Sequence, residues 1–138
     1  MSRLRVNEWP KERDSELLDI WESTIGYFNR ISEAMHHMPI DMHFDLNKRL
    51  LNSSLATSAH IAKASKAKSE MNYQNALIDA IEAIHLTTAK IYVAYQLNYI
   101  RFNLYQEIYE KGRLLIERIN SLLWTRDANQ WESHQPLI

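Results

Sequence analysis

Four long segments of this chain repeat apolar side chains every three or four residues, and little in the sequence would interrupt a helix. This spacing is the period of an α-helix with one apolar face. Only two glycines and three prolines occur among the 138 residues, too few for the many turns of a sheet protein. The chain is therefore predicted to be all-α, with long helices joined by a small number of turns.

The predicted helices, in chain order, span residues 15–38, 41–68, 73–99 and 103–126. Because their connections are only a few residues long, neighbouring helices must run antiparallel. Residues 14–126 are thus expected to form one domain, an up-down-up-down four-helix bundle. The flanking segments, 1–13 and 127–138, are expected to be extended tails.

The same spacing predicts which side chains face the core. In the first helix the inner stripe is Leu18, Trp21, Ile25, Phe28 and Met35. The other three helices contribute apolar residues that include Leu50, Leu55, Ile61, Leu77, Ile84, Ile91, Ile108, Leu115 and Ile119. Gly26 and Gly112 lie inside helices, where glycine costs about 1 kcal/mol relative to alanine. We therefore expect close helix packing at both glycines.

Composition excludes several classes of protein. The chain has no cysteine, which excludes disulfides and thiolate sites and fits a reducing cytoplasm. No segment reaches the ~18 uninterrupted apolar residues of a membrane span, and the first ten residues contain no apolar run of signal-peptide length. We expect a cytoplasmic protein that does not enter a membrane.

Two groups of residues have spacings found in enzyme sites. Glu33 and His36, and likewise Glu82 and His85, have the Glu-x-x-His spacing of di-iron bundles, but no glutamate precedes Glu70 on the second helix to complete the ligand set. Arg30 and His36 have the spacing seen in one class of small helical ribonucleases. Solvated helix faces are sufficient to explain these residues and are the favoured interpretation, and no phosphate loop or nucleophile motif occurs. We predict no metal, no cofactor and no enzyme activity.

Basic residues form the most suggestive cluster. The net charge is −1, yet residues 41–72 carry five bases and three acids. In an up-down-up-down bundle the second and fourth helices end on the same side, which would gather Lys63, Lys66, Lys68, Arg113 and Arg118. Such a patch is predicted to contact nucleic-acid phosphates. The alternative is that these cations only complement the carbonyl ends of helices.

Tyrosines concentrate near the turn between the third and fourth helices. They are Tyr92, Tyr95, Tyr99, Tyr105 and Tyr109. One small core cannot take all of these rings. They are expected either to line a subunit interface, where tyrosine is enriched, or to cap the bundle.

Stretches of two predicted helices resemble a known superfamily of four-helix bundles. In the second helix these are Phe44–Leu51 and Ser58–Ala64, and in the fourth they are Tyr109–Leu115 and the later Trp124. The superfamily contains the ribosomal-RNA intervening-sequence proteins and the accessory variability determinants of diversity-generating retroelements. The fourth helix is more similar to the retroelement proteins.

This resemblance implies a homo-oligomer, specifically a homopentamer. The retroelement branch further implies a non-enzymatic accessory protein that binds its reverse transcriptase and RNA or DNA through basic residues, here the five cations named above. The alternative, implied by the intervening-sequence branch, is an oligomeric protein-binding bundle without nucleic-acid affinity.

Overall fold

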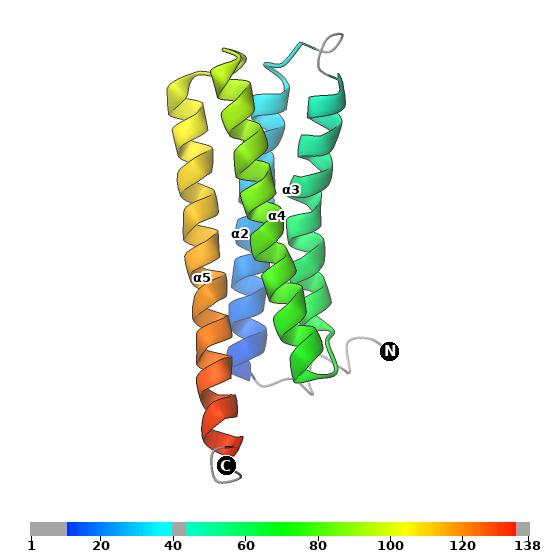
Figure 1. The fold of residues 1–138 in the computed structure, drawn as a ribbon, viewed down its shortest axis with the longest axis vertical. Coiled ribbons are helices and arrows are strands. Elements are labelled where there is room, and N and C mark those ends of the chain that lie inside the picture. Colours follow the sequence, from blue (N-terminus) through cyan, green and yellow to red (C-terminus); the bar gives the residue numbers. More distant parts are fainter. Residues whose placement is uncertain (1–10, 40–43, 135–138) are drawn as a thin grey trace.

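The computed structural model describes residues 11–39 and 44–134, including the side chains of residues 15–39 and 45–123. These residues form four α-helices and no strand. In the labels of Figure 1 the helices are α2 (Lys11–Met35), α3 (Phe44–Ser65), α4 (Glu70–Gln96) and α5 (Phe102–His134). None of the helices, in the part described, is long and apolar enough to cross a membrane.

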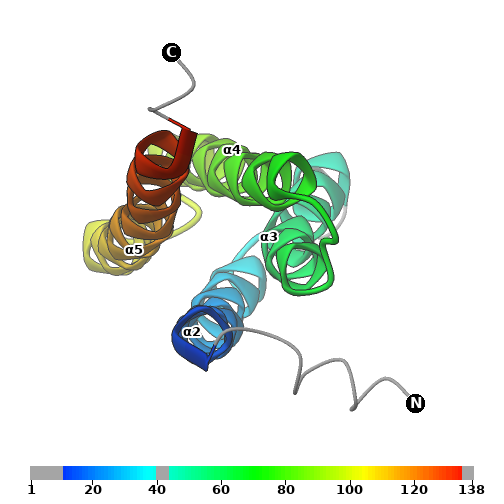
Figure 2. The same cartoon turned by 90° about the horizontal axis from the view of Figure 1, so that it is seen from below.

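The helices run alternately up and down around one core (Figure 1). Each packs against the next along the chain, and α5 closes the ring by packing against α2. Consequently α3 and α5 stand at opposite corners of the bundle, as do α2 and α4 (Figure 2). The predicted four-helix arrangement is confirmed.

Two helices extend at least four residues beyond a predicted end, whereas the other differences in helix bounds are of three residues or fewer. α2 begins at Lys11 rather than residue 15, and α5 continues to His134 rather than residue 126. Neither added segment contains glycine or proline, so nothing in the backbone stops the helix there. The remaining parts of the predicted tails, residues 1–10 and 135–138, lie outside the described residues.

The turn between α4 and α5 is held by a hydrogen-bonded cap. Asn98 adopts the left-handed conformation, with φ of 64°. Its backbone N–H donates to the Tyr95 carbonyl oxygen, and the Tyr99 N–H donates to the Ala94 carbonyl oxygen, at 2.9 Å each. This is the Schellman pattern, which satisfies carbonyls at a helix end. Asparagine tolerates the left-handed region better than most residues.

We expect Asn98→Ala to destabilise the bundle. Alanine pays about 1–2 kcal/mol in the left-handed region, whereas Asn98→Gly should be neutral or stabilising. Urea unfolding of both variants checks this. Equal midpoints for the two variants would contradict the role of this backbone conformation.

The core is built from the helix faces that point to the bundle axis. Its largest fully buried side chains are Leu17, Ile20, Tyr27, Ile31, Leu50, Ile61, Tyr73, Leu77, Ile84, Ile91, Ile108 and Ile119. The predicted inner faces of the third and fourth helices are confirmed at Leu77, Ile84, Ile91, Ile108, Leu115 and Ile119. Leu55, predicted to be buried, is instead 45% exposed.

The predicted inner stripe of the first helix is wrong in its first half, whereas Met35 packs against the core and the residues predicted to flank the stripe, Leu17, Ile31 and Met38, are buried. Leu18, Trp21 and Ile25 are exposed, and the core of α2 is instead made by the neighbouring stripe that includes Leu17, Ile20 and Ile31. That stripe contains Thr24, whose burial costs little because its hydroxyl donates to the Trp21 carbonyl oxygen of its own helix. α2 thus has two apolar stripes, and packing decides which one is inside.

The two helical glycines differ in how closely neighbouring atoms approach them. A Cβ at Gly112 would lie 3.1 Å from Ile84 Cγ2 and 3.3 Å from the Tyr27 hydroxyl, so the predicted close packing is confirmed there. The same burial raises the pKa of the Tyr27 phenol above its ordinary value. At Gly26 nothing lies within 4 Å, and the predicted close packing is wrong because that face of α2 points outward.

Candidate protein-binding surfaces

Large apolar side chains line the face of α4 that points away from the core. Along the helix these side chains follow one another at intervals of seven, eight, seven and four residues, so they all lie on one helix face. With exposed fractions between 44% and 70%, they are Met71, Ile78, Leu86, Val93 and Leu97, which we call the α4 stripe. Ile84 and Ile91 are buried on the opposite face. Within the bundle, therefore, only one of two apolar faces of α4 is covered.

A second apolar surface lies between α2 and α3. It is a hollow of about 230 Å³ with Leu18 and Trp21 on α2 and Ile61, Ala62 and Ser65 on α3 among its lining residues. The small side chains of α3 leave room for the hollow. Ile25 and Leu55, both exposed, continue the same helix faces towards the other end of the bundle. We call this surface the α2–α3 groove.

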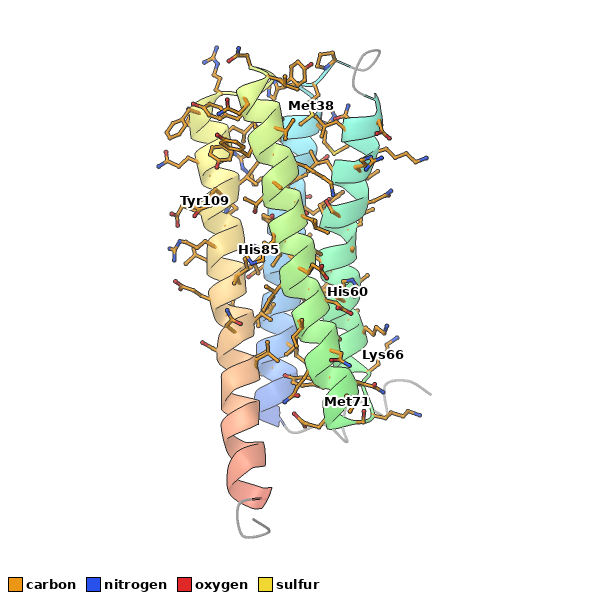
Figure 3. All side chains as sticks on the ribbon, in the orientation of Figure 1. Met38, His60, Lys66, Met71, His85 and Tyr109 are labelled. Carbon is orange, nitrogen blue, oxygen red and sulfur yellow. The ribbon has the colours of Figure 1, made fainter. Side chains whose placement is uncertain are left out.

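Aromatic rings join α4 to α5 near their connecting turn. Tyr95 and Tyr105 stack, with ring centroids 5.1 Å apart and 12° between the planes. Tyr92 and Tyr109 pack against Tyr105 and stay exposed, and Phe102 completes the cluster (Tyr109 is labelled in Figure 3). Burial, and then the neighbouring tyrosines, raises the pKa of Tyr105. The predicted tyrosine cluster thus packs two helices together and adds exposed rings beside the α4 stripe.

A cleft of about 760 Å³ opens at the same end of the bundle. Tyr95, Tyr99 and Phe102 form part of its wall. Arg30 donates hydrogen bonds to Glu33 on α2 and to Glu107 on α5, and the bond to Glu107 raises the pKa of Arg30. No serine, threonine or cysteine, the usual side-chain nucleophiles, is among the described residues that line the cleft.

The residues considered for enzyme chemistry are not assembled into a site. Glu33 is engaged by Arg30, and His36 Nδ1 lies 2.8 Å from the Ser32 carbonyl oxygen of its own helix. Glu82 and His85 are exposed on α4, at the corner opposite α2. Among the described side chains, those of residues 15–39 and 45–123, no group of three histidine, aspartate or glutamate residues is placed to hold a metal ion.

The five cations predicted to bind nucleic acid lie on opposite corners of the bundle. Lys63, Lys66 and Lys68 are exposed at the end of α3, and Lys66 lies near the lower end in Figure 3. Arg113 and Arg118 lie on α5, which does not neighbour α3. The structure therefore divides the predicted patch into two parts.

Both arginines of this set already have acidic partners. Arg113 pairs with Glu110 at 3.0 Å and with Glu117. Arg118 pairs with Asp19 of α2 at 3.1 Å and donates to the Ser23 hydroxyl at 2.8 Å, so it holds α5 to α2. Nucleic-acid binding by the five cations stays a prediction.

Comparison with known proteins decides the family. The profile of the 23S rRNA-intervening sequence proteins matches residues 16–121, which include all of α3 and α4 and most of α2 and α5. The chain belongs to this family. The predicted resemblance to the superfamily is thereby confirmed for the intervening-sequence branch, whereas the retroelement branch gains no support and stays a prediction.

A solved structure shows the same fold as this intervening-sequence protein. It is a protein of unknown function from the S23 ribosomal protein family of Bacteroides thetaiotaomicron, determined at 1.70 Å resolution. The TM-score is 0.71 at 18% sequence identity, covering 78% of this chain and 96% of the other. At this identity the likeness concerns the fold alone. No curated protein matches the sequence.

Sequence reasoning missed both apolar surfaces of the intervening-sequence protein. Leu18, Trp21 and Ile25 were assigned to the core, and the α4 stripe was not recognised. A signal was present, because α4 carries large apolar residues on both faces, and a helix that is apolar all round is normally buried all round.

Proposed function

We propose that this intervening-sequence protein is a non-enzymatic homo-oligomer that binds protein through the α4 stripe and the α2–α3 groove. The α4 stripe carries the proposal, since five large apolar side chains stay exposed along the whole helix. Large apolar side chains exposed together on one face often mark protein interfaces. The pentamer implied by the resemblance is the stoichiometry we expect.

Several features favour a protein partner over a substrate. The exposed apolar residues lie on regular helix faces, which suit helix-to-helix packing. The cleft at the α4–α5 turn has mixed charge, and its arginine at position 30 is held by two carboxylates. Exposed tyrosines beside the stripe, Tyr92 and Tyr109, are of a residue type enriched at interfaces.

Light scattering coupled to size exclusion tests the proposal. We expect the purified protein to have a mass several times the 16.3 kDa of one chain, and to keep it upon dilution. A mass of one chain at every concentration would contradict self-association.

We also expect no nucleic-acid binding. A mobility-shift assay with RNA and single-stranded DNA at ~50 mM salt, where phosphate contacts are strongest, should show no retarded band. Arg113 and Arg118 are occupied by carboxylates, and three lysines remain at one end of α3. A shift that Lys63→Glu/Lys66→Glu/Lys68→Glu abolishes would instead support the retroelement accessory function.

A further inference from the structure

We infer that the cleft at the α4–α5 turn binds a short zwitterionic peptide that carries an aromatic side chain. The residues that line the cleft come from the end of α2, the turn and the start of α5, at the upper end of the bundle in Figure 1. Its volume of about 760 Å³ lies within the range of small-ligand sites. None of its lining residues belongs to the α4 stripe or the α2–α3 groove, so this inference is independent of the proposed self-association.

The side of the cleft between α2 and α5 carries an excess of negative charge. Glu33 on α2 and Glu107 on α5 both accept hydrogen bonds from Arg30, each through its Oε1 atom. Two carboxylates around one guanidinium leave one net negative charge. No other hydrogen bond reaches either carboxylate from the described residues, although a carboxylate can accept about four. This side therefore suits an ammonium group, such as the N-terminus of a peptide.

Arg30 also has one donor without an acceptor. Its Nε atom is buried and finds no hydrogen-bond partner among the described residues. Burying a donor without an acceptor is costly, so an oxygen atom is expected beside Nε. The carbonyl oxygen of a bound peptide would supply this acceptor.

The turn side of the cleft carries a positive charge that has no acidic partner. Arg101 lines the cleft, is exposed and forms no ion pair with the described residues. The Tyr105 N–H donates to the Arg101 carbonyl oxygen, so the first three N–H groups of α5 have no partner within the helix. A cation and a helix N-terminus both favour a carboxylate.

The spacing of the two charged sides sets the length of the ligand. Arg101 precedes Glu107 by six residues, or about 9 Å along a helix at about 1.5 Å per residue. An extended peptide covers this distance with two or three residues, at roughly 3.3–3.6 Å each. The ammonium and carboxylate groups of a single amino acid are bonded to one carbon and cannot reach both sides.

Aromatic rings give the ligand its third feature. Tyr95, Tyr99 and Phe102 line the cleft, and Tyr95 packs against Phe102 with ring centroids 5.7 Å apart. A further ring from the ligand can pack against this group, and aromatic pairs are favourable beyond the area that they bury. Counting histidine as neutral, the charged residues that line the cleft sum to zero. A zwitterion matches this balance, whereas a phosphate-bearing ligand does not.

Isothermal titration calorimetry of the intact protein with alanyl-phenylalanine tests the inference. The N-acetyl derivative of this dipeptide lacks the ammonium group, and its C-terminal amide lacks the carboxylate. We expect each derivative to bind at least tenfold more weakly than the free dipeptide, because a hydrogen bond to a charged group is lost. Free phenylalanine should also bind at least tenfold more weakly, because it cannot span the cleft.

Arg101→Gln locates the carboxylate end of the ligand. It should weaken binding of the dipeptide at least threefold and leave the affinity for the C-terminal amide unchanged. Arg101 is exposed, so the variant should retain wild-type helicity by circular dichroism. Lys66→Gln is the matched control, because it removes an exposed cation at the opposite end of the bundle and should bind as wild type does (Figure 3).

Three results would overturn this assignment of the cleft. The first is no heat of binding with the dipeptide at millimolar concentrations. The second is a derivative, or free phenylalanine, that binds as tightly as the dipeptide. The third is an equal loss of affinity in Arg101→Gln and Lys66→Gln, which would place the ligand elsewhere on the surface.

Discussion

The double variant Leu86→Glu/Val93→Glu is expected to be a folded monomer. Both side chains are about half exposed in the single chain, at 50% and 44%, so folding alone does not bury the new carboxylates. Assembly would bury both new carboxylates with no cation placed to pair with them. Leaving a charge uncompensated in an interface costs about 3–5 kcal/mol, and each 1.4 kcal/mol is a factor of ten in affinity. The loss of association should therefore exceed a hundredfold.

Leu114→Glu is the matched control for this variant. Leu114 is 49% exposed on α5, so it resembles Leu86 in exposure but lies outside the α4 stripe and the α2–α3 groove. We expect its mass by light scattering to equal that of wild type. If Leu114→Glu dissociates the assembly as completely as the double variant does, the α4 stripe is not the specific interface. If the double variant keeps the wild-type mass, the stripe has no part in assembly.

Gly112→Leu is expected to lower the free energy of unfolding by about 3 kcal/mol, at the upper end of the usual cost of overpacking. Already the first added carbon would sit 3.1 Å from Ile84 Cγ2 and 3.3 Å from the Tyr27 hydroxyl. Ile84 and Tyr27 are themselves fully buried and have little room to move. Thermal and urea unfolding should show the loss, with Gly112→Ala falling between wild type and Gly112→Leu.

Gly26→Ala is expected to stabilise the protein, the opposite of the effect expected at Gly112. Gly26 is also a helical glycine, but open space surrounds it. Alanine there should raise the free energy of unfolding by up to about 1 kcal/mol, because it loses less conformational entropy than glycine on folding. If Gly112→Ala stabilises the protein as much as Gly26→Ala does, the contact between α2, α4 and α5 at Gly112 is looser than the structure shows.

Prediction from sequence succeeded where a helix has one clear apolar stripe. In the fourth helix the spacing of Ile108, Leu115 and Ile119 points to a single face, and all three are buried. It failed in α2, where Leu17 and Leu18 begin two stripes about 100° apart around the helix. The stripe that includes Trp21 looks the more hydrophobic of the two in the sequence, yet it is exposed. The stripe that Thr24 interrupts is the buried one.

The charged residues show a second limit of sequence reasoning. Lys63 and Arg118 both lie towards the same end of the bundle, as the alternation of helices predicts. Which helices are neighbours depends on how the ring closes, and here α5 packs against α2 and α4. Arg118 therefore meets Asp19, 99 residues away in sequence, and not the lysines of α3. Pairing between distant residues is a property of the packed arrangement.

The sequence alone determined that this protein is all-α, because periodic apolar residues and the scarcity of glycine and proline are local properties that each helix carries by itself. Only the tertiary structure decided which faces remain uncovered. A bundle can bury one side of each helix, and the rotation of α2 and α4 about their own axes is set by packing against neighbours. That rotation leaves Leu18, Trp21 and the α4 stripe at the surface.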